Sequence, residues 1–337
     1  MPARRSSPSM ADVAAHVGVS HQTVSRVLNK SPLVRPETRE RVEQAMKELG
    51  YRRNSAARAL VTNRSARLGM VSAHLALHGP SRIAASVDAA AREVGYDVSL
   101  VGLETVSPST VRVAVERLLD QAVEAVLVAA AHRPAIEAAR AMDLPVPLVL
   151  VQGVEPGDHL AVGIDQVAGA RAAVGHLLDL GHRRVAHVAG PLDWAEAVQR
   201  REGWLAAHRE RDLEPGPELA GDWSAAGGHA AGALLAAGDD VTAVFAANDA
   251  TAMGLLKALH DAGLSLPDDL SVVGFDDSPE AAYTWPALTT VAQRFSELGE
   301  RAVGLALQAI EGGTGRPPTP VPLLVPHLVV RDSAARA

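Results

Sequence analysis

The chain has 337 residues, a formal net charge of −7 and a hydrophobic content of 47%. This length predicts two or three folding units with ample apolar material for their cores. The absence of cysteine excludes a disulfide framework, a thiolate metal site and a cysteine nucleophile. No apolar run is typical of a signal peptide or approaches the ~18 residues of a membrane span, so we expect a cytoplasmic protein without a membrane partner.

The first predicted elements are two short helices joined by a tight turn. Ser9 is a suitable N-cap for the first helix, and Gly18 is expected to end it. Ser20 is a suitable N-cap for a second helix, from His21 to about Asn29. A third helix is predicted to begin at Pro36 and to end before Gly50. Two short helices across a turn, with a third behind them, are the layout of a helix-turn-helix DNA-binding head.

The second helix is amphipathic, as a recognition helix must be. Val24, Val27 and Leu28 fall on one arc, which is expected to pack inward. A polar helix face by itself is more often merely solvated. Here we expect the polar face to present hydrogen-bonding groups to base edges in a major groove, through His21, Gln22, Ser25, Arg26 and Asn29.

Charge separates this region from the rest of the chain. Residues 1–67 hold 13 basic and 5 acidic residues, a net charge of +8, so the remainder carries −15. A basic head on an acidic body points to double-stranded DNA as a partner, because phosphate repels the body and attracts the head. Among the basic residues, Arg35 and Arg53 are expected to contact phosphate.

A short segment, residues 54–64, follows the head. Ala56, Ala57, Ala59 and Leu60 favour a helix, but one of this length is marginal in water and orders only when something holds it. The alternative is a flexible linker in which the alanines have no role. We therefore predict a head over residues 1–53, a hinge over 54–64 and a ligand-binding and dimerisation body over 65–337.

The body alternates between apolar runs and alanine-rich helical stretches, which is typical of doubly wound α/β architecture. The predicted strands are 67–73, 97–103, 123–131, 146–152, 184–189, 242–247 and 271–275. The predicted helices are 81–95, 108–120, 134–142, 166–180, 195–210, 224–237 and 249–262. Two such series indicate two subdomains, and a cleft between subdomains is a usual place for a small ligand.

Several strings carry a family resemblance. The head contains DVAAHVGVSHQTVSRVLN, TRERVEQAMKELGY and NSAARAL, and the body contains LALHGPS, VAGP, GDWSA, AAND, SVVGFDD and LTTVAQ in this order. Together they resemble the LacI/GalR family of transcriptional repressors to about residue 332. The resemblance implies a periplasmic-binding-protein-like body whose chain crosses between subdomains near 164, 292 and 322. The N-subdomain would comprise about 65–164 and 293–321, and the C-subdomain about 165–292 and 322–332.

The resemblance also implies roles for individual residues. Two hinge helices, one from each protomer, would pair in the minor groove, where Leu60 would wedge a base step. A small effector, expected to be a sugar or galactoside, would bind in the cleft and release the head from its operator. The residues expected to contact it, from their matches to the family motifs, are Leu77, Pro80, Ile83, Arg200, Trp223, Asn248, Asp276 and Gln293.

Simpler interpretations stay open for three of these residues. Arg200 can be a surface residue, with the register shifted to Arg201, and Asn248 can be only a helix cap. Trp223 can be an ordinary core residue. In the loop after the third predicted strand, where the family pattern offers an acidic residue, the chain reads AAAHRPA, with His132 or Arg133 facing that region.

Further expectations concern function, cofactors and assembly. A corepressor-type regulator that responds to a purine or another metabolite is the main alternative. A glycoside hydrolase using Asp165 or the Asp276–Asp277 pair is disfavoured, and we expect no enzyme activity. No nucleotide-binding glycine motif and no HxxxH or HExxH spacing occurs, so no cofactor or metal is expected.

The ending LVVRDSAARA has no leucine heptads, so we expect a homodimer, held in part by helix 81–95.

Overall fold

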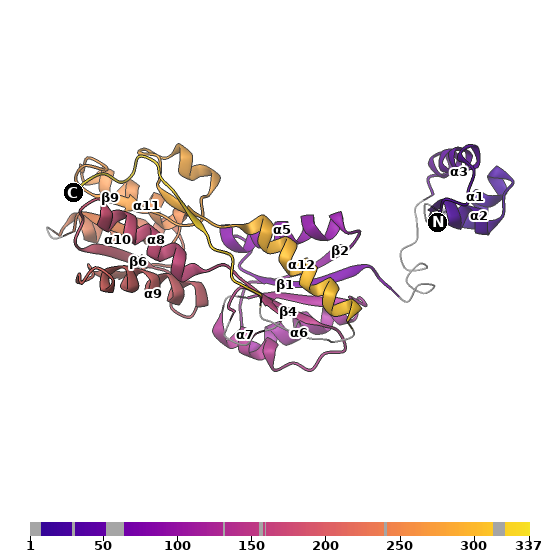
Figure 1. The fold of residues 1–337 in the computed structure, drawn as a ribbon, viewed down its shortest axis with the longest axis horizontal. Coiled ribbons are helices and arrows are strands. Elements are labelled where there is room, and N and C mark those ends of the chain that lie inside the picture. Colours follow the sequence, from indigo (N-terminus) through magenta and orange to yellow (C-terminus); the bar gives the residue numbers. More distant parts are fainter. Residues whose placement is uncertain are drawn as a thin grey trace, which may run out of the picture. The chain divides into compact units, whose positions relative to one another are not determined.

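The computed structural model describes residues 8–28, 31–51, 64–130, 132–154, 158, 160–238, 241–312 and 321–337. Internal contacts divide the chain into two compact units, Met1–Ser65 and Ala66–Ala337, which we call the head and the body. Figure 1 shows the elements of both units. The predicted hinge segment 54–64 lies outside the described residues except for Arg64.

The described residues of the head form the three helices that its sequence predicts, α1 (Met10–Val17), α2 (His21–Leu28) and α3 (Pro36–Leu49). Ser9 caps α1, because its Oγ accepts a hydrogen bond from the Asp12 amide at 3.3 Å and its own amide donates to the Asp12 carboxylate at 2.7 Å. Gly18 ends the helix with a left-handed φ of 72°. The local signals are therefore sufficient to define these helix boundaries.

Two arginines of the head are structural. Arg41 donates to the carbonyl oxygen of Val17 at 2.7 Å, and Arg39 donates to that of Ser31 at 2.7 Å. The first bond satisfies a carbonyl at the end of α1, which has no partner within its own helix. Some basic residues of the head therefore stabilise its fold. Only those whose side chains face outward are available to contact a polyanion.

The first lobe of the body is a parallel five-stranded sheet in the order β2-β1-β3-β4-β5. Its strands are β1 (Arg67–Ala73), β2 (Asp97–Leu103), β3 (Ala125–Ala129), β4 (Leu148–Val151) and β5 (Ala161–Val162). One face packs against α5 (His78–Glu93) and α12 (Phe295–Glu311), and the other against α6 (Pro108–Leu119) and α7 (Arg133–Arg140). We call this the N-lobe.

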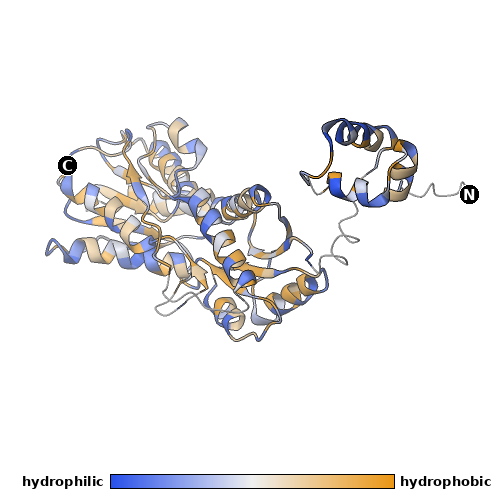
Figure 2. Ribbon diagram, turned by 45° about the vertical axis from the view of Figure 1, so that its right-hand side comes forward, coloured by the Kyte–Doolittle hydropathy of each residue, from blue (hydrophilic) through white to orange (hydrophobic). Residues whose placement is uncertain are grey.

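The second lobe, the C-lobe, repeats this plan with a parallel four-stranded sheet in the order β7-β6-β8-β9. Its strands are β6 (Val185–Ala189), β7 (Glu218–Ala220), β8 (Ala243–Ala246) and β9 (Ser271–Val273). Helices α8 (Gln166–Asp179) and α9 (Ala195–Arg209) cover one face, and α10 (Ala225–Ala236) and α11 (Asp249–Asp261) the other. Figure 2 shows apolar strands enclosed by helices of mixed polarity.

Close packing of α10 on α11 explains the alanine- and glycine-rich sequence of this region. A Cβ atom at Gly228 would collide with the backbone of Thr251, and one at Gly254 would collide with the backbone of Ala225. The two helices therefore approach at a distance that only glycine permits at these points. Dense backbone packing here fills part of the core in a protein with only 3% aromatic residues.

Three connections join the lobes. The chain leaves the N-lobe between β5 and α8, returns between β10 (Thr290–Ala292) and α12, and leaves again before β11 (His327–Val329). Strands β10 and β11 pair with each other in antiparallel fashion, and Ile164 forms a bridge with Leu324. The connections thus run side by side as a bundle between two rigid sheets, an arrangement suited to hinge motion.

A histidine in the core of the C-lobe makes stability depend on pH. His187 is fully buried in β6, its ring stacks on Phe245 at 4.9 Å, and its Nδ1 lies 3.0 Å from the Phe245 carbonyl oxygen. Nε2 has no hydrogen-bond partner among the described residues. Burial lowers the pKa of His187 to about 4, because the imidazolium would lose its hydration.

We expect the free energy of unfolding to decrease as the pH falls from about 6.5 to about 4, because the unfolded chain binds a proton in this range and the folded chain does not. The loss of stability is about 3 kcal/mol once the pH is below about 4, and there is no loss above about pH 6.5. Urea unfolding at pH 7.5 and pH 5.0 measures the part, about 2 kcal/mol, that is lost by pH 5.0. His187→Gln, which is neutral throughout and can still donate to Phe245, should show a smaller loss at pH 5.0; parallel losses in both proteins would contradict the assignment.

Candidate functional site

The outward face of α2 carries free polar side chains. His21, Gln22 and Arg26 are exposed and Ser25 is half-buried, whereas Val24 and Val27 are buried. No described residue forms a hydrogen bond or ion pair with the side chains of these four polar residues. Arg35 is exposed at the N-terminus of α3. The predicted DNA-contacting residues Asn29, Arg53 and Leu60 lie outside the described residues.

A pocket between the two lobes of the body is the second candidate site; the space inside it, including open solvent at its mouth, is about 640 Å³. The N-lobe contributes the end of β1, the start of α5, and the ends of β3 and β4. The C-lobe contributes the start of α9 and the loops that follow β7, β8 and β9. The pocket therefore lies at the carboxyl ends of the strands, where α/β sheets bind ligands.

All eight predicted effector-binding residues line this one pocket, although they are spread over more than 200 positions of the chain. Leu77, Pro80 and Ile83 come from the N-lobe. The five from the C-lobe and the second crossing are Arg200, Trp223, Asn248, Asp276 and Gln293.

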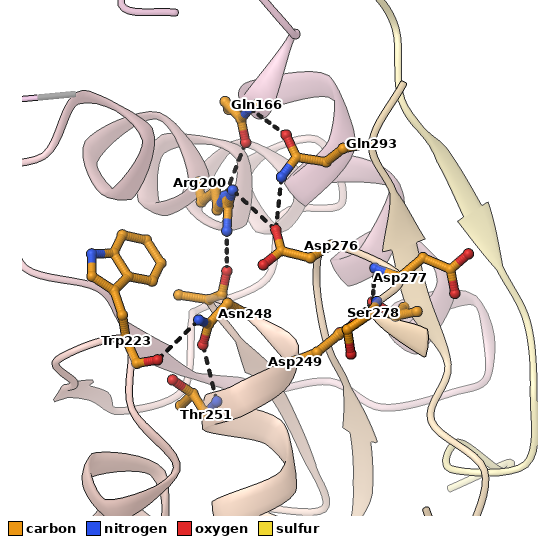
Figure 3. A network of polar contacts seen from close by, with 12 residues as sticks. Gln166, Arg200, Trp223, Asn248, Asp249, Thr251, Asp276, Asp277, Ser278 and Gln293 are labelled. Atoms are coloured by element: carbon orange, nitrogen blue, oxygen red, sulfur yellow. Dashed lines mark hydrogen bonds and ion pairs between the residues drawn. The ribbon is translucent and has the colours of Figure 1, made fainter. Parts of the chain in front are cut away.

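Four polar side chains at the pocket form a closed ring, shown in Figure 3. Arg200 Nε donates to Gln166 Oε1 at 2.9 Å, and Gln166 Nε2 donates to Gln293 Oε1 at 2.9 Å. Gln293 Nε2 donates to Asp276 Oδ1 at 2.7 Å, and Arg200 Nη2 lies 3.5 Å from the same oxygen. Arg200 also donates to the carbonyl oxygen of Ala247. The ring fixes the guanidinium of Arg200 and the carboxylate of Asp276 in place, so these side chains need little further ordering when a ligand binds.

Burial shapes the electrostatics of this ring. It raises the pKa of Asp276, and the positive charge of Arg200 opposes that rise. Behind Asp276, burial and the Asp276 charge raise the pKa of Asp249 to about 7, although Thr290 and the Ser278 amide donate hydrogen bonds to it. Two carboxyl groups thus share one buried region with a single guanidinium.

Asn248 and Trp223 are linked to each other. Asn248 caps α11, with its Oδ1 accepting from the Thr251 amide at 3.0 Å, and its Nδ2 donates to the Trp223 carbonyl oxygen at 3.0 Å (Figure 3). Trp223 is 6% exposed, and the centroid of its ring lies 5.4 Å from Arg200 Cζ. Both simpler interpretations are therefore true in part: the asparagine is a helix cap and the tryptophan is nearly buried, yet each also lines the pocket.

The register of the arginine pair is clear from the geometry. Arg200 is 5% exposed and lies in the pocket. The side chain of Arg201 is 41% exposed, and its Nε lies 2.7 Å from Glu218 Oε1. Adjacent helix positions point about 100° apart, so one of the two faces the pocket and the other faces β7.

Comparison with known proteins matches both parts of the chain. Residues 9–54 match the bacterial regulatory proteins, lacI family, and residues 174–334 match a periplasmic binding protein-like domain. The lactose operon repressor of Escherichia coli (strain K12) is 36% identical over 309 residues, which are 89% of this chain and 84% of that one. GalS, an HTH-type transcriptional regulator of Salmonella typhimurium, is 38% identical over 96% of each chain. The chain belongs to the lacI family of bacterial regulatory proteins.

Solved structures support the same assignment. This lacI-family chain matches a crystal structure of the lac repressor dimer bound to operator and the anti-inducer ONPF with a TM-score of 0.85 and 34% identity, over 97% of this chain and 99% of that one. A complex of the transcriptional regulator CelR with cellobiose matches with a TM-score of 0.72 and 33% identity, over 97% and 100% of the two chains. The predicted fold class, a helical head on an α/β periplasmic-binding-like body, is confirmed.

Several residues that line the pocket of this lacI-family protein were missed by the sequence analysis, namely His78, Gln152, Trp194, Glu196 and Phe295. Gln152 directly follows β4, so the rule that ligands bind at the carboxyl ends of strands could have identified it. Glu196 lies one helical turn before Arg200 on α9 and therefore shares its face. Gln166 was also missed, because only the fold brings it to Gln293.

The loop after β3 does not supply a side chain to the pocket in the described residues. His132 packs its ring against those of His74 and Trp194, at 5.4 and 4.9 Å, and its Nε2 lies 3.4 Å from Asp193 Oδ2. Arg133 lines a separate cavity between α7 and α9. His132 therefore reaches the site indirectly, through Trp194, which does line the pocket.

Two kinds of feature are absent from the described residues. They contain no group of three or more histidine, aspartate or glutamate side chains placed to hold a metal ion. Within the same ranges, every helix is too short or too polar to cross a lipid bilayer.

Proposed function

We propose that this lacI-family transcriptional regulator is a repressor whose head binds operator DNA and is released when a small sugar binds between the lobes of the body. The observation that carries the proposal is the interlobe pocket with its ring of Arg200, Asp276, Gln293 and Gln166. Amide, guanidinium and carboxylate groups in fixed positions suit the adjacent hydroxyl groups of a sugar. Trp223 and Leu77 provide an apolar wall for its C–H face.

Binding can be coupled to DNA release because the pocket is shared by both lobes. A ligand shifts a conformational equilibrium only through unequal affinity for the two states. A sugar held by Arg200 and Asp276 of the C-lobe and by Leu77, Pro80 and Ile83 of the N-lobe has such a preference. The segment that joins head to body enters β1 of the N-lobe, so a change in lobe angle would be passed to the heads.

The proposed DNA contacts of the head are base readout by His21, Gln22, Ser25 and Arg26, with phosphate contact by Arg35. Asn29, Arg53 and Leu60 remain predictions for the same interface. Figure 1 shows the helices of the head, of which α2 would enter the major groove. We propose the domain division given above, with residues 1–53 as the DNA-binding head, 54–64 as the hinge and 65–337 as the ligand-binding and dimerisation body.

A homodimer is the proposed assembly, because two heads reading two half-sites multiply specificity. Two aromatic side chains at the end of the 3₁₀ helix η1 (Pro279–Tyr283) are unusually exposed: Tyr283, its last residue, at 89% and Trp285, two positions beyond it, at 94%. Aromatic residues are enriched in protein interfaces. Together with the helix expected from the sequence, α5, they are our candidates for contacts between protomers.

The hydrolase alternative gains no support from the geometry. Asp277 turns away from the pocket and pairs with Arg331 at 2.7 Å, so it does not flank a bond together with Asp276. The matched relatives are described as transcriptional regulators and operon repressors.

The test combines binding and release on the full chain. Thermal unfolding is measured with neutral pentoses, hexoses, β-galactosides and cellobiose, with hypoxanthine to test the corepressor alternative. Any sugar that raises the melting temperature is then added to the protein bound to a fluorescent duplex, selected from a random library by the protein itself. We expect at least one sugar to stabilise the chain and release the DNA. Stabilisation by hypoxanthine alone, with tighter DNA binding, would refute the proposal.

A further inference from the structure

Glu196 is a buried acidic residue to which the function proposed above assigns no role. It lies in the first turn of α9, lines the interlobe pocket and is 9% exposed. Its Oε2 atom has no hydrogen-bond partner among the described residues. Buried polar atoms of native proteins are almost always satisfied, so an orphan atom in the wall of a pocket indicates a group that a ligand supplies.

The charges in the pocket are unequal. Besides the imidazole of His78, its ionisable lining residues are Glu196, Arg200 and Asp276, which are two carboxyl groups and one guanidinium. Arg200 is already engaged by Asp276, Gln166 and the Ala247 carbonyl oxygen. Burial and the charge of Asp276 raise the pKa of Glu196, and its own backbone amide, the charge of Arg200 and the N-terminus of α9 oppose that rise. In its ionised form Glu196 leaves the pocket with an uncompensated negative charge.

A second buried polar atom without a hydrogen-bond partner indicates which chemical group the ligand supplies. The indole Nε1 of Trp223, which lines the same pocket, is buried and has no hydrogen-bond partner among the described residues. The carboxylate oxygen needs a donor and the indole N–H needs an acceptor. A hydroxyl group is both donor and acceptor, whereas a phosphate dianion or a carboxylate is an acceptor only.

We propose that Glu196 sets the charge selectivity of the effector site: its carboxylate accepts a hydrogen bond from a hydroxyl group of an uncharged sugar and excludes sugar phosphates and sugar acids. This inference rests on the proposed function, because it defines the class of sugar that the same pocket takes. Repulsion of an anion by Glu196 and Asp276 is strong because both carboxyl groups are buried. The site therefore distinguishes a sugar from its phosphorylated or oxidised form.

The test uses isothermal titration of the full chain at pH 8 with matched pairs of sugars. The pairs are galactose with galactose 6-phosphate and with galacturonate, glucose with glucose 6-phosphate, and ribose with ribose 5-phosphate. The wild type should bind the neutral member of its preferred pair at least 100-fold more tightly. Glu196→Gln, which keeps the shape and removes the charge, should reduce this ratio at least tenfold, mainly through tighter binding of the anion.

Glu202→Gln is the matched control, because Glu202 lies on the same helix but is exposed and pairs with Arg209. It should keep the wild-type ratio. Glu196→Ser serves as a second variant and should reduce the ratio as Gln does. Unchanged ratios in both Glu196 variants, or a charged sugar preferred by the wild type, would overturn the inference and leave sugar binding standing. A wild type that binds no member of any pair would refute both the inference and the proposed function.

Discussion

Replacement of Arg200 by alanine is expected to abolish the response to sugar while leaving operator binding intact, which gives a permanently repressing protein. The guanidinium is 5% exposed and joins Gln166, Asp276 and the Ala247 carbonyl oxygen. Hydrogen bonds to charged groups contribute about 1.5–3 kcal/mol each, so the loss of two ligand contacts weakens sugar binding by more than about 100-fold. Calorimetry with the sugar identified by thermal shift measures this loss.

The matched control is Arg201→Ala, because Arg201 pairs with Glu218 outside the pocket and should retain sugar affinity. Removal of Arg200 leaves the Asp276 carboxylate buried without its cation, so the variant should also unfold at a lower temperature. Arg200→Lys keeps the charge without the planar fork, and it should fold better than the alanine variant while still binding sugar weakly. Wild-type sugar affinity in both Arg200 variants would show that the effector site is elsewhere.

Replacement of Arg26 by alanine is expected to reduce operator specificity. The side chain is exposed on α2 and no described residue engages it, so its loss should leave the head folded. A good contact with a base edge discriminates by about 1–3 kcal/mol, so affinity for the selected operator should fall by about 10- to 100-fold. Gln22→Ala should act in the same direction. Fluorescence anisotropy on selected and random duplexes at fixed salt concentration measures both affinities.

Lys47→Ala provides the comparison for charge alone, because Lys47 is exposed in the last turn of α3 and its loss removes one positive charge from the head. Both variants should weaken binding to random DNA slightly, since counterion release depends on charge. Only Arg26→Ala should change the ratio of specific to random affinity. Equal ratios in the two variants would argue against α2 as the recognition helix.

The head could be predicted almost entirely from its sequence, because its boundaries depend on neighbours along the chain. The capping box of Ser9 with Asp12, the left-handed glycines after α1 and α3, and the buried arc of α2 act within one or two helical turns. The alternation of strands and helices in the body was also predicted. A buried parallel strand needs an apolar run wherever it lies in the sheet.

The short strands and helix α12, the last helix of the chain's described residues, were not predicted from the sequence. Strand β7 has three residues and β10 has three, and such segments are strands only because a neighbour pairs with them. Helix α5 begins at His78, three positions before the predicted start, because the chain leaving β1 turns at once into the helix that borders the pocket. For the strands, the deciding contact is distant in sequence.

The sequence alone determined which residue types this regulator places at its two sites, through local periodicity and motifs that resemble its family. Only the tertiary structure decided how they are connected. The ring joins Gln166 to Gln293 across 127 positions, and the burial of Glu196 depends on two lobes that meet around α9. Hydrogen-bond geometry and desolvation depend on distances in space, which periodicity along a chain does not encode.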